Sequence, residues 1–181
     1  MRWGSGPLAE IHHPLHAGTN LPAGVVLLVL SVKIDVNDLA RQGRDFPWHK
    51  PSACPHCGLS LWWHGFVLAY FATVIEAVFL RRLYCPHCQS VHRLRPSGYW
   101  QRFRSSEQEI FEAMDHRTHK KRWRPDLPRS RQRQWWRRLG RLIRSVLGVS
   151  FVGSMLQGFS QLIRQGLIPV SSAAKSENRL I

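Results

Sequence analysis

Hydrophobic and polar positions along the chain predict a strand-rich part followed by a helix-rich part. Apolar runs rich in β-branched and aromatic residues favour strands, because such side chains fit a pleated, half-buried surface. A short helix is predicted at residues 37–42, ended by Gly43. Strands followed by helices, rather than alternating with them, indicate an α+β fold. The predicted strands cover residues 25–36, 61–72, 78–84 and 91–95.

Helical periodicity begins after the turn at residues 96–98. Ser106, followed three residues later by Glu109, is a capping-box pattern and predicts a helix to about residue 121. Ser130 is expected to cap a second helix, and a third is predicted after Gly148. Apolar residues recur at helical spacing in both and predict a shared core: Trp135, Trp136, Leu139, Leu142, Ile143, Val146 and Leu147, then Met155, Leu156, Phe159, Leu162 and Ile163.

Two Cys-Pro-His-Cys segments, at residues 54–57 and 85–88, contain the four cysteines of the chain. Residues 1–20 lack the apolar stretch of a secretory signal, so a cytoplasmic location with reduced thiols is expected. Reduced cysteines in this spacing favour a metal over disulfides. No membrane span is predicted, since the longest apolar run is far shorter than the ~20 residues that a spanning helix needs.

The two cysteine pairs form a complete ligand set. We call each Cys-Pro-His-Cys segment a knuckle. The two residues between its cysteines let both sulfurs face one ion, and two knuckles supply four thiolates. A closed tetrahedral set leaves no open position for substrate, which is typical of a structural site. The sequence therefore predicts one structural Zn²⁺ held by Cys54, Cys57, Cys85 and Cys88. Iron is the competing metal, because rubredoxins hold an iron on four cysteines, although those electron carriers are typically small and acidic.

The other residues of the two knuckles predict which side chains are exposed and how the backbone turns. His56 and His87 are predicted to be exposed at the knuckle tips, because four cysteines already complete the ligand shell. Gly58 suits the left-handed turn that closes a knuckle. Gln89 stands at the equivalent position of the second knuckle, which puts the geometry there in question.

The strong positive charge of the chain indicates what kind of partner it binds. Lys and Arg number 26 against 11 Asp and Glu, which gives a net charge of +15 and favours polyanionic partners. The excess is concentrated at residues 117–144, where only Asp126 is acidic and Trp123, Trp135 and Trp136 lie among the arginines. The predicted nucleic-acid contacts are Lys120, Lys121, Arg122, Arg124, Arg129, Arg131, Arg133, Arg137, Arg138, Arg141 and Arg144.

The basic region allows more than one binding mode. Leu147-Gly148-Val149-Ser150 resembles the turn of a helix-turn-helix, which would make the basic region a DNA reader; ordinary packing helices are the alternative. A basic protein that binds membrane surfaces would use the same amphipathic residues. A protein-interaction adaptor is the third possibility.

Catalysis is not expected. Glu107, Glu109, Glu112 and Asp115 fit the solvated, acidic start of a helix, where the helix dipole favours carboxylates. The i,i+4 pairs Glu112/His116 and Asp115/His119 are a metal-binding alternative. The default prediction is a protein that is not an enzyme.

Several motifs together resemble a known family. CPHCG, LWWHGF, LRRLYCPHC and VHRLRPSGYW are similar to the zinc ribbons that begin or accompany bacterial insertion-sequence transposases. The resemblance covers roughly residues 47–103 and implies four cysteine ligands, binding to double-stranded DNA and a transposase as a possible partner. It implies no catalytic residues, because too little chain remains for a transposase catalytic domain.

The combined patterns predict a zinc ribbon with four cysteine ligands, followed by a basic helical region. The predicted segments are a flexible tail at 1–22, a strand plus short helix at 23–46, a ribbon of three antiparallel strands at 47–104, a basic helical region at 105–168 and a loose tail at 169–181.

Overall fold

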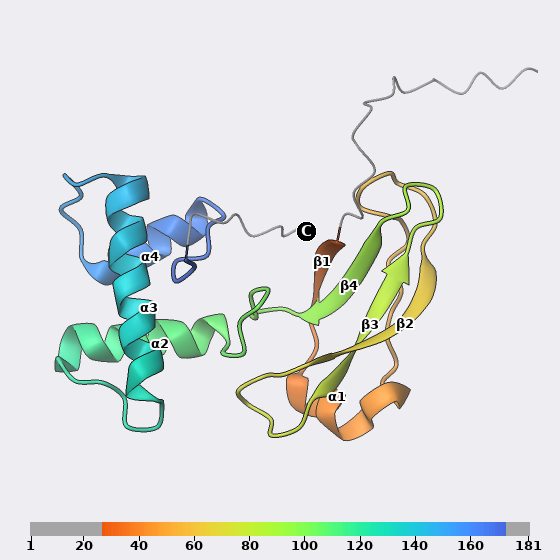
Figure 1. The fold of residues 1–181 in the computed structure, drawn as a ribbon, viewed down its shortest axis with the longest axis horizontal. Coiled ribbons are helices and arrows are strands. Elements are labelled where there is room, and N and C mark those ends of the chain that lie inside the picture. Colours follow the sequence, from red (N-terminus) through yellow and green to blue (C-terminus); the bar gives the residue numbers. More distant parts are fainter. Residues whose placement is uncertain (1–26, 173–181) are drawn as a thin grey trace, which may run out of the picture.

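The computed structural model describes residues 27–172, which form a sheet unit and a helical unit joined by the segment after the last strand (Figure 1). The predicted N-terminal tail at 1–22 lies outside the described residues, as do residues 173–181 of the predicted C-terminal tail. Within the described part, the order of strands and then helices confirms the α+β prediction.

The sheet has four strands in the order β1-β4-β3-β2. Its strands are β1 (Leu27–Val32), β2 (Trp62–Ala69), β3 (Val78–Tyr84) and β4 (Val91–Pro96). β2, β3 and β4 pair antiparallel, and β1 pairs in parallel with β4, so the sheet is four-stranded and mixed rather than the predicted ribbon of three antiparallel strands. Leu30 lies opposite Leu94 in this pairing, and both are buried, so burial of apolar side chains explains the fourth strand.

A short helix, α1 (Val36–Gln42), follows β1. The side chain of Asp35 accepts a hydrogen bond from the amide of Asn37 at 2.6 Å and starts the helix, so Val36 is helical rather than the last residue of the predicted strand. Val36 and Leu39 are buried against Phe71 and Leu80 of the sheet unit. Gly43 ends the helix with φ 58° and opens a short 3₁₀ turn, η1 (Gly43–Asp45).

The helical unit consists of α2 (Glu107–Lys120), α3 (Arg129–Leu142), a π-helical turn η2 (Ile143–Leu147) and α4 (Met155–Arg164). Ser106 caps α2 as predicted. Ser130 does not cap α3, because the helix already begins at Arg129, directly after Pro128. The predicted apolar positions of α3, η2 and α4 all belong to one core, centred on Trp100, Trp135 and Phe159.

The predicted helix-turn-helix turn at residues 147–150 is not formed as such. A helix-turn-helix joins its helices by a turn of ~3–4 residues, whereas residues 148–154 all lie between η2 and α4. Ser154 opens α4 with a new capping box to Gln157. The packed chain also continues past residue 168, into the predicted loose tail, since Val170 is fully buried.

A buried arginine fastens the junction between the two units. Arg95, at the end of β4, is 5% exposed and donates hydrogen bonds to the backbone carbonyls of Tyr99 at 3.1 Å and Phe103 at 2.7 Å. Its guanidinium lies 4.8 Å from the ring centre of Phe71. Burial, followed by the nearby charge of Arg93, lowers the pKa of Arg95 to about 10, so it stays charged at neutral pH. The charged side chain of Arg95 therefore orders the junction through hydrogen bonds to two carbonyl oxygens and contact with an aromatic ring.

Gly158 tests the packing of α4 on the π-helical turn. A Cβ at this position would lie 2.4 Å from Cδ1 of Ile143, so Gly158→Ala is expected to cost about 1–3 kcal/mol through overpacking. Gly140→Ala is the matched control: the nearest atoms to its Cβ are 3.7 Å away, and alanine in a helix is favoured over glycine by about 1 kcal/mol. Urea denaturation followed by circular dichroism measures both, and an equal effect of the two substitutions would contradict the packing argument.

Candidate metal centre and basic surface

The two cysteine knuckles are closed by matching backbone hydrogen bonds. The amide of Cys54 donates to the carbonyl of Leu59 at 2.7 Å, and the amide of Cys85 donates to the carbonyl of Ser90 at 3.0 Å. Gly58 adopts φ 77° and Gln89 adopts φ 57°, so both knuckles turn through the left-handed region. The second knuckle therefore has the same turn as the first although it lacks the glycine, and the positive φ of Gln89 adds backbone strain there.

The fold brings the four predicted ligands together. Knuckle one precedes β2 and knuckle two joins β3 to β4, so strand pairing places them side by side. All four sulfurs lie within 4.8 Å of one another, with Cys54 Sγ 3.7 Å from Cys88 Sγ and Cys57 Sγ 3.4 Å from Cys85 Sγ. These separations exclude disulfides, whose sulfurs lie about 2.05 Å apart, and suit bonds of about 2.3 Å from four sulfurs to one ion. The four cysteines could hold a metal ion.

The cluster is packed into the sheet unit. Cys54 and Cys85 are 2% and 0% exposed and share a core with Leu30, Leu83 and Leu94. A metal held there would link the segment before β2 to the β3–β4 hairpin. Water has little access to two of the four sulfurs, which is typical of a closed structural site.

The thiols differ in their readiness to ionise. Burial raises the pKa of Cys54, and burial raises the pKa of Cys57 to about 12. Burial also acts upward on the pKa of Cys88, but hydrogen bonds from the Ser90 side chain and backbone outweigh it and lower the pKa to about 6. Metal binding at neutral pH must therefore displace protons from Cys54 and Cys57, so metal affinity falls as pH decreases.

His92 is a neighbour of the centre that is not among the ligands predicted from the sequence. It is fully buried on β4, and its Nε2 lies 3.2 Å from Cys54 Sγ. Burial, followed by the charge of His56, lowers the pKa of His92, which favours a neutral ring. In the metal-bound protein, a neutral imidazole protonated on Nε2 would donate a hydrogen bond to the Cys54 thiolate. The strand alternation after Cys88, with Ser90, His92 and Leu94 buried, was the signal available in the sequence.

The histidines inside the knuckles and the acids of α2 are not among the ligand atoms that converge. His56 and His87 are exposed, as predicted. Asp115 pairs with His119 at 3.1 Å, whereas Glu112 does not pair with His116 and instead contacts Arg124 at 2.9 Å. Within residues 27–172, the four cysteines are the one group whose ligand atoms converge on a possible metal position.

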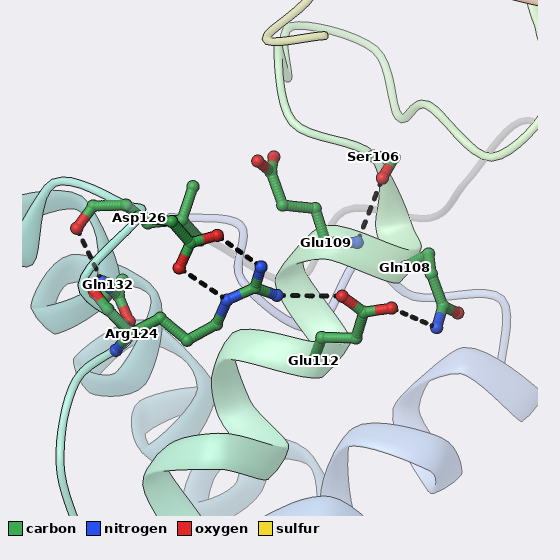
Figure 2. Close-up of polar contacts among 8 residues, drawn as sticks. Ser106, Gln108, Glu109, Glu112, Arg124, Asp126 and Gln132 are labelled. Carbon is green, nitrogen blue, oxygen red and sulfur yellow. Dashed lines mark hydrogen bonds and ion pairs between the residues drawn. The ribbon is translucent and has the colours of Figure 1, made fainter.

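Arg124 differs from the other predicted nucleic-acid contacts because it is neutralised inside the protein. Figure 2 shows its guanidinium between Asp126 and Glu112, at 2.5 and 2.9 Å. Its backbone is held as well, since Gln132 donates to the carbonyl of Arg124 at 2.8 Å. The hydrogen bonds to Asp126 and Glu112 raise the pKa of Arg124. Arg124 therefore fixes the α2–α3 connection and is a structural residue.

The remaining predicted contacts have no carboxylate partner among the described residues. On α3 and η2, four arginines at successive turns form an exposed stripe opposite the buried Trp135 and Leu139; we call it the arginine stripe. Its members are Arg133, Arg137, Arg141 and Arg144. Arg131 and Arg138 are half-buried beside it, and the other exposed cations are Lys120, Lys121, Arg122 and Arg129 around the α2–α3 connection.

In comparisons with known proteins, no family model, curated protein or solved structure matches the chain. Among the described residues, no helix has the length and apolar character needed to cross a membrane.

Removing two ligands tests the metal centre. Cys54→Ser/Cys85→Ser is expected to lose the metal and unfold the sheet unit, because structural zinc contributes about 10–16 kcal/mol, as much as a whole domain's stability. Metal content by mass spectrometry and thermal unfolding measure the effect. His87→Ala, which changes only an exposed knuckle residue, is the control and should keep both metal and melting temperature. An unchanged cysteine variant would refute the centre.

The two residues with positive φ, Gly58 and Gln89, test whether the two knuckles have the same backbone geometry. Gln89→Gly is expected to stabilise the metal-bound protein by about 1 kcal/mol, because glycine removes the cost of a positive φ. Gly58→Ala is expected to destabilise it by a similar amount. Guanidinium unfolding at saturating metal gives both values, and the same sign in both would show that the knuckles are not equivalent.

Proposed function

We propose that the protein binds nucleic acid, with double-stranded DNA as its ligand, and that a structural Zn²⁺ stabilises its sheet unit. The observation that carries the proposal is the arginine stripe: four exposed guanidinium groups along α3 and η2, with no carboxylate of the described residues paired to them. Successive stripe residues on α3 advance about 6 Å along the helix axis. A regular row of cations is suited to a polyanion, whose bound counterions are released on contact.

Zinc is the metal supported by the ligand chemistry and by charge. Four thiolates in a closed set suit Zn²⁺ or an iron centre. The chain carries a net charge of +15, unlike the small acidic iron carriers considered above. Zinc at Cys54, Cys57, Cys85 and Cys88 would supply a fixed link between the knuckles and no redox chemistry.

The resemblance of the knuckles and intervening strands to ribbons of insertion-sequence transposases supports a narrower role. On that resemblance we propose an accessory protein of a mobile element, acting without catalysis of its own and beside a transposase. The arrangement of β2, β3 and β4 around the cysteines is compatible with such a ribbon.

A protein partner is the second candidate, favoured by the surface of β2. This strand is at the edge of the sheet, and Trp62 and Leu68 on it are 61% and 52% exposed. Exposed apolar side chains on an edge strand are typical of protein contact sites. An adaptor of this kind would depend on β2 and would keep its partner after the arginine stripe was neutralised.

DNA titration at several salt concentrations tests the proposed function. If the basic surface neutralises ~6 phosphates, affinity falls about a thousandfold between ~50 and ~200 mM salt. Arg133→Gln/Arg137→Gln/Arg141→Gln is expected to reduce the log–log salt slope by about 3. Lys33→Gln/Arg41→Gln/Lys50→Gln removes the same charge from the sheet unit and should change the slope by less than about 1.

Fluorescence anisotropy with a labelled duplex gives these slopes. Absence of binding by the unsubstituted protein at low salt would reject the proposal. Equal slopes for the two triple variants would show that only net charge, and not the stripe, attracts the duplex.

A further inference from the structure

A hollow lies between the junction segment and α3, on the side of the helix next to the arginine stripe. Its volume is about 310 Å³, and its walls come from residues 101–105, α3 and residues 168–172. Four arginines line it: Arg102 and Arg104 from the junction, and Arg131 and Arg138 from α3. Arg131 and Arg138 are two helix turns apart, so they lie on one face of α3.

The lining of the hollow is strongly cationic. It includes no Asp or Glu, and none of its four arginines forms an ion pair with a carboxylate of the described residues. Arg104 is partly occupied, since its guanidinium lies 5.2 Å from the ring centre of Tyr70. The other three arginines line the hollow without any such contact. Like charges around one space repel one another, and an anion between them would reduce the repulsion.

Ser105 supplies an independent indication of a ligand. It lines the hollow, is 2% exposed, and its Oγ is buried without any hydrogen-bond partner. A buried hydroxyl that lacks a partner destabilises the folded state. An oxyanion in the hollow would accept the hydroxyl hydrogen.

The backbone at the hollow is held in a strained conformation. Arg102 has φ 69°, which is unfavourable for a residue with a side chain. The turn is maintained by a hydrogen bond from the amide of Phe103 to the carbonyl of Trp100 at 3.1 Å, and by Arg95, which donates to the carbonyl of Phe103. The junction thus keeps Arg102 at the mouth of the hollow rather than leaving it in a relaxed loop.

We propose that this hollow binds a phosphate group, with Arg102, Arg131 and Arg138 as its cationic ligands and Ser105 as a hydroxyl donor. The proposal rests on the proposed function in one respect: the phosphate is a backbone phosphodiester of the DNA that the arginine stripe contacts. Guanidinium forks and a hydroxyl are the groups that proteins use for phosphate oxygens. The hollow adds a fixed anchoring point to a stripe that would otherwise follow the duplex in any register.

Ser105→Ala is the most selective test, because it removes a hydroxyl that the fold does not use. The unfolding free energy is expected to stay constant or rise, since a buried unpaired hydroxyl disappears. Affinity for a labelled duplex is expected to fall about ten- to a hundredfold, the effect of one hydrogen bond to a charged group. A purely structural role for Ser105 would change stability without this selective loss of affinity.

A charge-matched pair tests the arginines. Arg131→Gln/Arg138→Gln and Arg133→Gln/Arg137→Gln remove the same charge from the same helix, the first pair from the hollow and the second from the stripe. The hollow pair is expected to weaken DNA binding at least tenfold more than the stripe pair. Circular dichroism confirms that both variants fold.

The outcomes separate the hollow from the proposed function. The unsubstituted protein could bind DNA while Ser105→Ala binds with the same affinity and the two arginine pairs weaken binding equally. This result would refute the phosphate site in the hollow and leave DNA binding supported. If the protein does not bind DNA, inorganic phosphate is used as the probe in thermal unfolding. If phosphate raises the melting temperature of the unsubstituted protein but not that of Ser105→Ala, the phosphate site in the hollow is supported although DNA binding is not. If phosphate changes both melting temperatures equally, the phosphate site is refuted too.

Discussion

Four thiols that must meet at one point constrain how the rest of the sheet unit is built. Cys54 and Cys57 precede β2, while Cys85 and Cys88 connect β3 to β4, so the sulfurs converge only when these three strands pair in their observed register. The core around the centre is small: Leu30, Leu83 and Leu94 are its buried aliphatic residues besides Leu61. With so little apolar material beside the cysteines, this part of the sheet would gain much of its stability from a metal held by the four sulfurs.

Charge is distributed so that the acidic residues of α2 serve the fold and the arginines of α3 remain available. Glu112 and Asp126 are used by Arg124, which fixes the connection between the two helices. The arginine stripe and the hollow receive none of this compensation among the described residues. The exposed arginines of the stripe therefore keep their positive charge available, and such a charge would concentrate polyanions near it.

The sequence predicted the parts of the structure that depend on local pattern. Strand runs at 78–84 and 91–95, the Ser106 cap and the apolar positions of α3 follow from alternation, capping chemistry and helical period, and each is present. The pairing of β1 with β4 is a long-range contact, and nothing in residues 25–36 indicates which strand they join. The hollow was also beyond prediction, because Arg102 and Ser105 meet Arg131 and Arg138 only after the junction folds against α3.

The two units have separate hydrophobic cores, and Arg95 is a principal tie between them. Its bonds reach backbone carbonyls, which every residue provides, rather than particular side chains of the helical unit. The junction therefore makes few demands on the amino acids it connects. Mutations that repack one core are expected to leave the other unchanged, so the half with the cysteine cluster and the cationic half can diverge at different rates, under different selection, within a single chain.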